Sequence, residues 1–245
     1  MEILCDLVLP CRDEEAALVG LLPRVPAGFA VIVVDNGSTD GTAEVARRWG
    51  ATVVPESVPG YGAAVHAGLL AATSEHVAFM DGDGSFDPDD LLPLLEDVRC
   101  GRADLAVGRR RPVARGAWPW HARLGNDLVV WWLRRRIGMT VHDIAPMRVC
   151  RRTALIELGV QDRRFGYPVE LLQRATVAGW RLRERDVAYH PRALGTRSKV
   201  SGSVRGTTRA ARDFWRVLDT TPRKRSLPPL RSFRARFRGD PGANA

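Results

Sequence analysis

The chain has 245 residues, of which 45% are hydrophobic and 27% are charged. A chain of this length and composition can form one α/β domain with a full core and short appendages. Its net charge of +9 lies mostly at one end, because residues 222–245 hold seven basic residues and one acid and so carry +6 of the total. Residues 1–221 are therefore nearly balanced, so the charge of the folded body is no argument for a DNA-reading surface, and no nucleic-acid partner is expected.

Residues 222–245 also contain several prolines, so the sequence predicts a basic, disordered tail. Such a tail is either a solvated arm or a contact to anionic lipid, in which Phe233 and Phe237 alternate with arginines. The N-terminus lacks the basic start of a signal peptide, and no segment approaches the roughly 18 uncharged apolar residues that span a bilayer. We expect a cytoplasmic protein whose tail can contact the inner face of the membrane.

Strand-like and helix-like segments alternate in the first half of the chain. Strands are predicted at residues 3–10, 30–35, 51–54, 76–80 and 104–107, and helices at 13–23, 38–49, 61–73 and 87–99. This order predicts a mainly parallel sheet with helices on both faces, in which ligands bind beyond the carboxyl ends of the strands. The second half is less regular: it has a tryptophan-rich amphipathic segment at 118–137, helices predicted at 168–178 and 203–218, and a strand predicted at 181–189.

Polar motifs follow the first three predicted strands. The first strand ends in LPCRDEE (9–15) and the second in VVDNGSTDGT (33–42), where Asp35 can accept hydrogen bonds from a base or ribose or can simply belong to a turn. The third motif, PGYGAAVHAG (59–68), has small residues that let a ligand approach the backbone, at a helix start that favours anions. It is not the glycine pattern of a dinucleotide dehydrogenase.

The most informative motif is FMDGDGSFDPDD (79–90), in which Asp81 and Asp83 follow a buried strand. Two carboxylates this close repel each other unless a cation neutralises them. Mg²⁺ and Mn²⁺ prefer oxygen ligands and often also bind substrate phosphates. The motif therefore predicts a divalent metal site, with an acidic, glycine-rich surface turn as the alternative.

The order of these four motifs resembles that of family 2 glycosyltransferases, and is most similar to the branch that transfers sugars to dolichol or polyprenol phosphate. The resemblance covers about residues 5–205 and implies a GT-A fold over residues 1–221, with a donor and metal half at 1–110 and an acceptor half at 111–221. It also implies a nucleotide-sugar donor and a Mg²⁺ or Mn²⁺ ion. It places these residues in the donor site: Pro10, Arg12, Glu14 and Asp35 at the nucleotide, Gly62 and Ala63 near the base or ribose, and Asp81, Gly82 and Asp83 at the metal and diphosphate.

Two residues depart from the family pattern. Tyr61 stands where many relatives have a basic residue, and Ser85 stands where a longer polar metal ligand is common. These departures concern the identity of the base and the affinity for the metal.

The acceptor half resembles the family through residues 107–112, 125–127, 142–152, 167–180 and 196–202. The resemblance places Asp143 at the transfer centre, and Arg197 and Lys199 in a basic loop near donor or acceptor phosphates. As alternatives, Asp143 caps a helix or pairs with an arginine at 148 or 151, and Glu170 is a favourable acid in a first helical turn.

Members of this family invert the anomeric centre, which implies a single in-line displacement of the nucleoside diphosphate. A hydroxyl acceptor needs a carboxylate base, for which Asp143 is the first candidate and Glu170 the second. A phosphate acceptor is already largely ionised and needs only positioning by basic residues, which suits Arg109, Arg197 and Lys199. The working hypothesis is a polyprenyl phosphate acceptor, and a soluble hydroxyl acceptor stays open.

Residues 118–137 have two interpretations. Trp118, Trp120, Trp131 and Trp132, with the arginines at 134–136, suit a bilayer interface. Alternatively, Leu128, Val129, Trp132 and Leu133 pack on the sheet, as apolar stripes of helices usually do.

Two other functional classes compete with glycosyl transfer. A sugar-phosphate nucleotidyltransferase could share the sheet and the acidic pair, but it usually has a glycine-rich basic turn where this chain has LPCRDEE. A non-catalytic lipid- or nucleic-acid-binding module would depend on the tail at 222–245.

Overall fold

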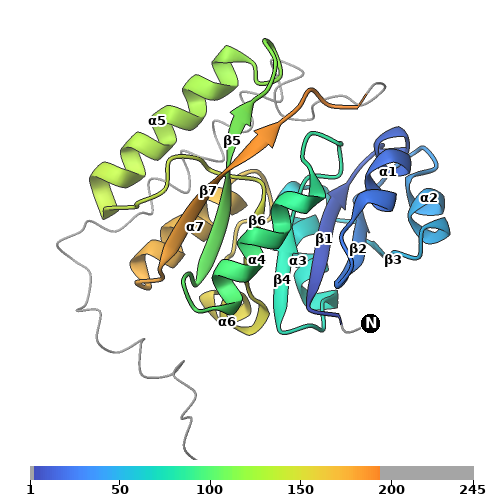
Figure 1. The fold of residues 1–245 in the computed structure, drawn as a ribbon, viewed down its shortest axis with the longest axis horizontal. Coiled ribbons are helices and arrows are strands. Elements are labelled where there is room, and N and C mark those ends of the chain that lie inside the picture. The colour runs from blue at the N-terminus through green and yellow to red at the C-terminus, as the bar shows by residue number, and fades with distance from the viewer. Residues whose placement is uncertain (1–2, 194–245) are drawn as a thin grey trace, which may run out of the picture.

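A computed structural model describes residues 3–193 of the chain (Figure 1). The strands are β1 (Cys5–Cys11), β2 (Phe29–Asp35), β3 (Thr52–Pro55), β4 (His76–Phe79), β5 (Leu105–Pro112), β6 (Arg148–Arg151) and β7 (Leu182–Tyr189). The helices are α1 (Glu15–Leu21), α2 (Thr42–Arg48), α3 (Tyr61–Ala71), α4 (Leu91–Arg99), α5 (Trp120–Ile137), α6 (Arg152–Leu158) and α7 (Tyr167–Val177). Short 3₁₀ helices follow α1 (Leu22–Arg24) and precede α4 (Pro88–Asp90).

The seven strands form one sheet in the order β3-β2-β1-β4-β6-β5-β7. Every neighbouring pair is parallel except those of β6, which runs antiparallel to both β4 and β5. The prediction of an α/β fold with a mainly parallel sheet is confirmed. The carboxyl ends of the parallel strands, and the N-terminal end of β6, therefore meet at one edge of the sheet.

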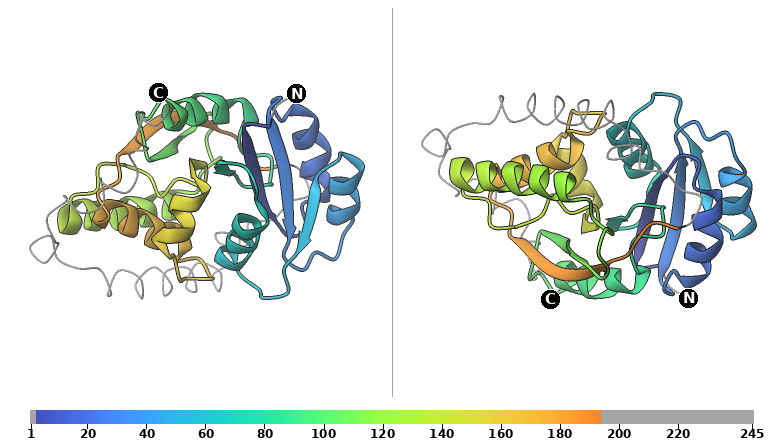
Figure 2. Two further views of the ribbon diagram at one scale, coloured as in Figure 1. Left: turned by 90° about the horizontal axis from the view of Figure 1, so that it is seen from below. Right: turned by 90° about the horizontal axis from the view of Figure 1, so that it is seen from above.

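Helices cover both faces of the sheet (Figure 2). Along β1, Leu7 and Leu9 pack in the core layer that contains residues of α1, α2 and α4, whereas Val8 packs in the layer that contains residues of α3, α5 and α7. This alternation follows from the two-residue period of a strand. It explains why the strands that are buried on both faces are apolar almost without interruption.

The sequence did not predict β6 and α6. Strand β6 has only four residues, RVCR, and two of them are arginines, so it lacks the apolar run that identifies a buried strand. It forms because β4 and β5 supply pairing partners on both sides. A strand fixed by its neighbours leaves little local signal.

The predicted strands and helices of the first half are found close to their expected bounds. Two of the helix starts use the expected carboxylates: the Asp40 side chain accepts the Thr42 amide at 3.0 Å, and that of Asp87 accepts the Asp89 amide at 3.1 Å. The helix predicted at 203–218, the basic residues Arg197 and Lys199, and the tail at 222–245 lie outside the described residues. None of the described helices combines the length and the hydropathy that crossing a membrane requires.

Asp97 of α4 fastens the edge strand β7 to the body of the protein. Its carboxylate is fully buried and is in contact with three arginines. The distances from the carboxylate oxygens are 2.7 Å to Arg102 Nε, 3.1 Å to Arg183 Nε and 2.6 Å to Arg185 Nε. The hydrogen bond from Arg185, ahead of that from Arg102, outweighs burial and lowers the pKa of Asp97 to about 2. The acid is thus held as an anion at neutral pH.

Replacing Asp97 by asparagine is expected to lower the free energy of unfolding by about 1–3 kcal/mol at pH 7, because charge-assisted hydrogen bonds to a buried acceptor are lost. The side chains of Arg102, Arg183 and Arg185 are 36–46% exposed, so water can replace part of the interaction that each loses in the variant. Because the folded pKa is depressed, this stabilisation is present above the ordinary carboxyl value of 3.8 and fades as the pH falls towards 2. Urea unfolding of Asp97→Asn at pH 7 and pH 3 measures it. The exposed neighbour Glu96→Gln is the control, and equal stabilities of the two variants at pH 7 would contradict the prediction.

Candidate functional site

The loops after β1 and β2 are joined by hydrogen bonds at the carboxyl edge of the sheet. The Asp13 amide donates to Ser38 Oγ at 3.0 Å, the Glu14 amide to Thr42 Oγ1 at 2.9 Å, and the Thr39 amide to Asp13 Oδ1 at 2.8 Å. The two predicted motifs therefore form one continuous wall, although more than twenty residues separate them in the chain.

Four residues predicted to bind the nucleotide lie in or beside this wall. Asp35 Oδ1 accepts the Ser38 amide at 2.9 Å, so the turn interpretation holds for that oxygen. Pro10 is half-buried at the end of β1, Arg12 is exposed, and Glu14 is buried. Their positions agree with a pocket wall at the strand ends, and their contact with a nucleotide remains a prediction.

The start of α3 is occupied by the protein's own backbone. The Gly62 amide donates to the Arg164 carbonyl at 3.1 Å and the Ala63 amide to the Arg163 carbonyl at 2.8 Å. A Cβ on Gly62 would lie 2.6 Å from the Asp162 carbonyl oxygen, so only glycine allows this approach. These two amides are not free to bind a phosphate. Any contact of this segment with a base or ribose would use other atoms.

Glu170 of α7 holds the loop that closes over α3. Its carboxylate accepts the Gln161 amide at 3.1 Å and the Asp162 amide at 2.6 Å, and it pairs with Arg174 Nε at 2.6 Å. The side chain is buried. The structure thus places Glu170 in a loop-holding position, with its oxygen atoms already engaged.

The acidic motif after β4 turns sharply at the sheet edge. Asp83 is 3% exposed, and its Oδ1 accepts the amide and the hydroxyl of Ser85 at 3.0 and 2.5 Å. Its Oδ2 lies 3.1 Å from Arg192 Nε. A Cβ at Gly82 would lie 2.5 Å from Cys11 Sγ, which explains the glycine between the two aspartates. The motif is therefore a buried turn rather than an acidic surface turn.

The environment of Asp81 disfavours the charged form of its carboxyl group. Burial, followed by repulsion from Asp83, raises the pKa of Asp81 to about 6, although the charges of Arg192, Arg148 and Arg110 lower it in part. A further cation beside such a carboxyl group would favour its anionic form and lower its pKa. Two hard oxygen ligands fit Mg²⁺ or Mn²⁺, which complete their shells with water and substrate phosphates. Within residues 3–193 there is no group of three or more His, Cys, Asp or Glu side chains that could hold a metal alone.

Arg148 is a buried cation with unused donors. It is 1% exposed, and the strand register places it opposite Phe79, two residues before Asp81. One guanidinium nitrogen donates to the Ile144 carbonyl at 3.2 Å. Within the described part of the chain, Nε and Nη1 have no hydrogen-bond partner. Buried donors of this kind are costly unless an anionic or polar ligand satisfies them.

Arg110 and Asp143 form a buried ion pair at the centre of the region that the sequence predicts to bind the acceptor. Arg110 Nη2 lies 2.6 Å from Asp143 Oδ1, while Arg110 Nε and the Arg110 amide donate to Oδ2 at 2.9 and 2.8 Å. The Ala145 amide also donates to Oδ1, at 3.1 Å. Burial alone would raise the pKa of Asp143, but Arg110 and these amides lower it below its ordinary value. The partner of Asp143 is Arg110, so the expectation of a pair with an arginine at 148 or 151 is wrong.

Two further contacts hold Arg110 in place. Its guanidinium carbon lies 3.9 Å from the centre of the Trp118 ring, and Asn126 Oδ1 accepts Arg110 Nη2 at 3.3 Å and the Ile144 amide at 3.0 Å. Asn126 belongs to α5, so this helix is hydrogen-bonded to the centre.

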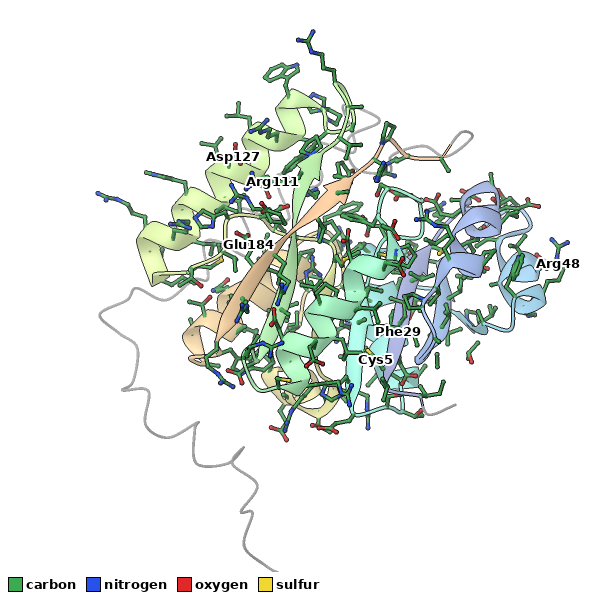
Figure 3. The ribbon with its side chains drawn as sticks, viewed as in Figure 1. Cys5, Phe29, Arg48, Arg111, Asp127 and Glu184 are labelled. Carbon is green, nitrogen blue, oxygen red and sulfur yellow. The ribbon has the colours of Figure 1, made fainter. Side chains whose placement is uncertain are left out.

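Arg109 points to a different place from Arg110. It lies with Arg111 and His142 along a groove of about 540 Å³ at the β5–β7 edge. Glu184 of β7 lies 4.0 Å from Arg109 and 2.9 Å from His142, and Figure 3 labels Glu184 and Arg111 on the adjacent strands. The groove also contains Asp90, the last residue of the acidic motif, and the role of Arg109 at a phosphate remains a prediction.

Sequence reasoning missed three arginines around Asp81: Arg110, Arg148 and Arg192. The run of arginines at 109–111 gives no signal for which one faces the site, because adjacent strand residues point to opposite faces. Arg148 opens the strand that was not predicted. Arg192 follows shortly after the predicted strand at 181–189, and its place beyond a strand end is the signal that could have found it.

The model of the family described as "Glycosyl transferase family 2" matches residues 6–159. The chain belongs to glycosyltransferase family 2. An uncharacterized glycosyltransferase of Mycobacterium tuberculosis is 58% identical over 212 residues, which is 86% of this chain and 96% of that protein. Polyprenol monophosphomannose synthase of Mycolicibacterium smegmatis is 33% identical over 210 residues, which cover 78% of each chain. The family member is thus an enzyme near the branch that transfers sugars to polyprenol phosphates.

Solved structures confirm the fold of this family member. Glucosyl-3-phosphoglycerate synthase of Mycobacterium tuberculosis, in complex with Mn²⁺, uridine-diphosphate-glucose and phosphoglyceric acid, superposes with a TM-score of 0.70. The match covers 88% of this chain and 78% of that one at 21% identity. The predicted GT-A fold is therefore confirmed.

Proposed function

We propose that this family 2 enzyme transfers a sugar from a UDP- or GDP-linked donor to a polyprenyl phosphate, with Mg²⁺ or Mn²⁺ as cofactor. The donor class is supported by the solved glucosyl-3-phosphoglycerate synthase complex that contains Mn²⁺ and UDP. The acceptor class is supported by relatives named polyprenol monophosphomannose synthase and undecaprenyl-phosphate mannosyltransferase. The chain would work at the inner face of the membrane, where a lipid-phosphate acceptor presents its head group.

On the donor side, Asp81 and Asp83 would hold the divalent ion, which supplies positive charge against the leaving diphosphate. Arg148, with two unused buried donors, and Arg110 and Arg192 carry further positive charge towards Asp81. Fixed cations that oppose a developing negative charge stabilise a transition state without reorganisation. The nucleotide would lie along the wall formed by the loops after β1 and β2, beside Pro10, Arg12, Glu14 and Asp35.

On the acceptor side, one observation carries the proposal: both candidate bases are already engaged inside the protein. Asp143 is bound on both oxygens by Arg110, and Glu170 by Arg174 and loop amides. A lowered pKa also makes Asp143 a weak base. A hydroxyl acceptor that used Asp143 or Glu170 as its base would have to break one of these sets of contacts, whereas a phosphate acceptor is already ionised and needs no base. Attack by a phosphate oxygen opposite the leaving diphosphate would invert the anomeric centre.

The test is a radiolabelled transfer assay with UDP- and GDP-sugars and Mn²⁺, using three acceptors: a polyprenyl phosphate, the same polyprenol without phosphate, and phosphoglyceric acid. We expect labelled lipid only with the polyprenyl phosphate, together with release of nucleoside diphosphate. Transfer to the free polyprenol or to phosphoglyceric acid alone would replace the proposal by a hydroxyl- or small-molecule-acceptor enzyme. Pyrophosphate release from a nucleoside triphosphate and a sugar phosphate would identify a nucleotidyltransferase instead.

A further inference from the structure

Helix α5 presents a row of large apolar side chains to solvent. Trp120, Leu124, Leu128 and Trp131 are 76%, 51%, 58% and 61% exposed. Their spacing of four, four and three residues places them on one face of the helix. These four residues are called the α5 stripe below. The helix also supplies buried residues to the core, namely Val129, Val130, Leu133 and Ile137.

The stripe differs from the other exposed apolar residues of the described chain. Single exposed apolar side chains are normal and need no explanation. The stripe instead continues through three turns of helix, over roughly 16 Å at 1.5 Å per residue. The interpretation that Leu128 packs on the sheet is wrong, whereas Val129 and Leu133 do pack there. The helix is rotated so that a tryptophan–leucine face remains outside.

The charges beside the stripe favour one kind of partner. Arg123, Arg134 and Arg135 are exposed on the same helix, and Asp127, labelled in Figure 3, is its one acidic residue. Tryptophan is enriched at the boundary between the hydrocarbon and the head groups of a bilayer. Arginines near the surface of anionic lipid each add to the affinity. An apolar helix face with arginines along it is the pattern of a helix that lies in the interface plane.

We propose that α5 docks on an anionic lipid bilayer through the α5 stripe and its exposed arginines. This site is separate from the tail at 222–245, and its test needs neither donor nor acceptor, so it can fail or succeed independently of the proposed function. The docked helix would also place the Arg110–Asp143 pair close to the bilayer. Asn126, on the same helix, hydrogen-bonds to Arg110, so the Arg110–Asp143 pair lies about one helix diameter, roughly 10 Å, from the lipid surface.

The experiment is co-sedimentation of the full chain with vesicles of phosphatidylcholine containing phosphatidylglycerol, and with vesicles of phosphatidylcholine alone. We expect binding to the anionic vesicles that weakens with salt. The double variant Trp120→Ser/Trp131→Ser should bind at least about tenfold more weakly, because it removes both aromatic anchors of the stripe. The control Trp49→Ser also removes an exposed tryptophan (53%), but from outside the stripe, and should bind like the wild type.

The arginines are tested by charge reversal in the same assay. Arg123→Glu/Arg135→Glu should lose binding to the anionic vesicles, because both side chains then repel the lipid head groups. Arg47→Glu/Arg48→Glu on α2 is the matched control and should keep the binding, since Arg48 lies at the opposite end of the molecule (Figure 3).

A second measurement covers the case in which the serine variant is damaged. Brominated lipids should quench tryptophan fluorescence of the wild type, and Trp120→Phe/Trp131→Phe should keep the binding but lose most of the quenching. Wild-type binding by Trp120→Ser/Trp131→Ser, or unchanged quenching in the phenylalanine variant, would overturn the proposal in favour of the tail. Analytical ultracentrifugation gives the oligomeric state of the wild type and of these variants. If the wild type is a dimer that the substitutions dissociate, and it does not bind vesicles, the stripe is a contact between two copies of the chain and the proposal is wrong.

Discussion

Asp83→Ala is expected to reduce sugar transfer by at least about 10²-fold, because a metal that neutralises a leaving diphosphate contributes several kcal/mol to the transition state. Asp83 is one of the two carboxylates predicted to hold the ion, and Asp81 alone would offer a weak site. The same substitution removes the hydrogen bonds to Ser85 and the ion pair with Arg192. Because the variant lacks one of the two predicted metal ligands, we also expect weaker Mn²⁺ binding. Titration of the protein with Mn²⁺ in the absence of nucleotide measures it.

The control for this prediction is Asp89→Ala, which removes an exposed acid of the same motif and should leave both turnover and Mn²⁺ binding unchanged. Thermal melting of both variants checks that the turn has not unfolded. Wild-type turnover and wild-type Mn²⁺ affinity in Asp83→Ala would remove the metal from the acidic motif.

Asp143→Asn is expected to lower the free energy of unfolding by about 3–5 kcal/mol, because it leaves a buried guanidinium without its counter-charge. The side chains of Arg110 and Asp143 are only 14% and 1% exposed, so water cannot replace the lost partner. The pKa of Asp143 is lowered in the folded state, so the stabilisation is present above the ordinary value of 3.8 and is lost as the pH falls below it. The difference between wild type and variant should therefore shrink in acid.

Denaturant unfolding at pH 7 and at a second pH below the ordinary carboxyl value measures this effect. Asp186→Asn is the matched control, since its pair with Arg111 at 2.9 Å lies on the surface and should be worth less than about 1 kcal/mol. The pH dependence of turnover separates the two roles of Asp143. A positioning residue leaves the pH profile of the remaining activity unchanged, whereas a small stability loss together with loss of the acidic limb of the profile would restore Asp143 as the base.

The first half of the chain could be predicted because its signals are local. Apolar runs of four to eight residues followed by polar turns fix strand ends, and the parallel order then gathers those turns at one edge. Asp81 and Asp83 are placed there by their own strand alone. The joining of the first two loops, by contrast, depends on side-chain hydrogen bonds such as that of Asp13 to Thr39, which no sequence period records.

The second half of the chain was harder to predict because its structure depends on contacts between residues that are distant in the sequence. Arg110 and Asp143 are 33 residues apart, and nothing near either one indicates the pairing. The choice between Arg109 and Arg110 depends on the phase of β5, which a run of three arginines hides. The exposure of Leu128 depends on the rotation of α5 about its own axis, which is set by packing after the helix forms.

The reversed direction of β6 has a consequence for how such an enzyme can diversify. Because β6 begins at the edge where β4 ends, the single connection at 138–147 delivers Asp143 and Arg148 to the rim without a second crossover. Under the proposed function, changes in this connection and in α5 would alter acceptor recognition while the strands that lead into the predicted nucleotide wall stay as they are. One inverted strand would thus make recognition of the donor and recognition of the acceptor separately adjustable within one sheet.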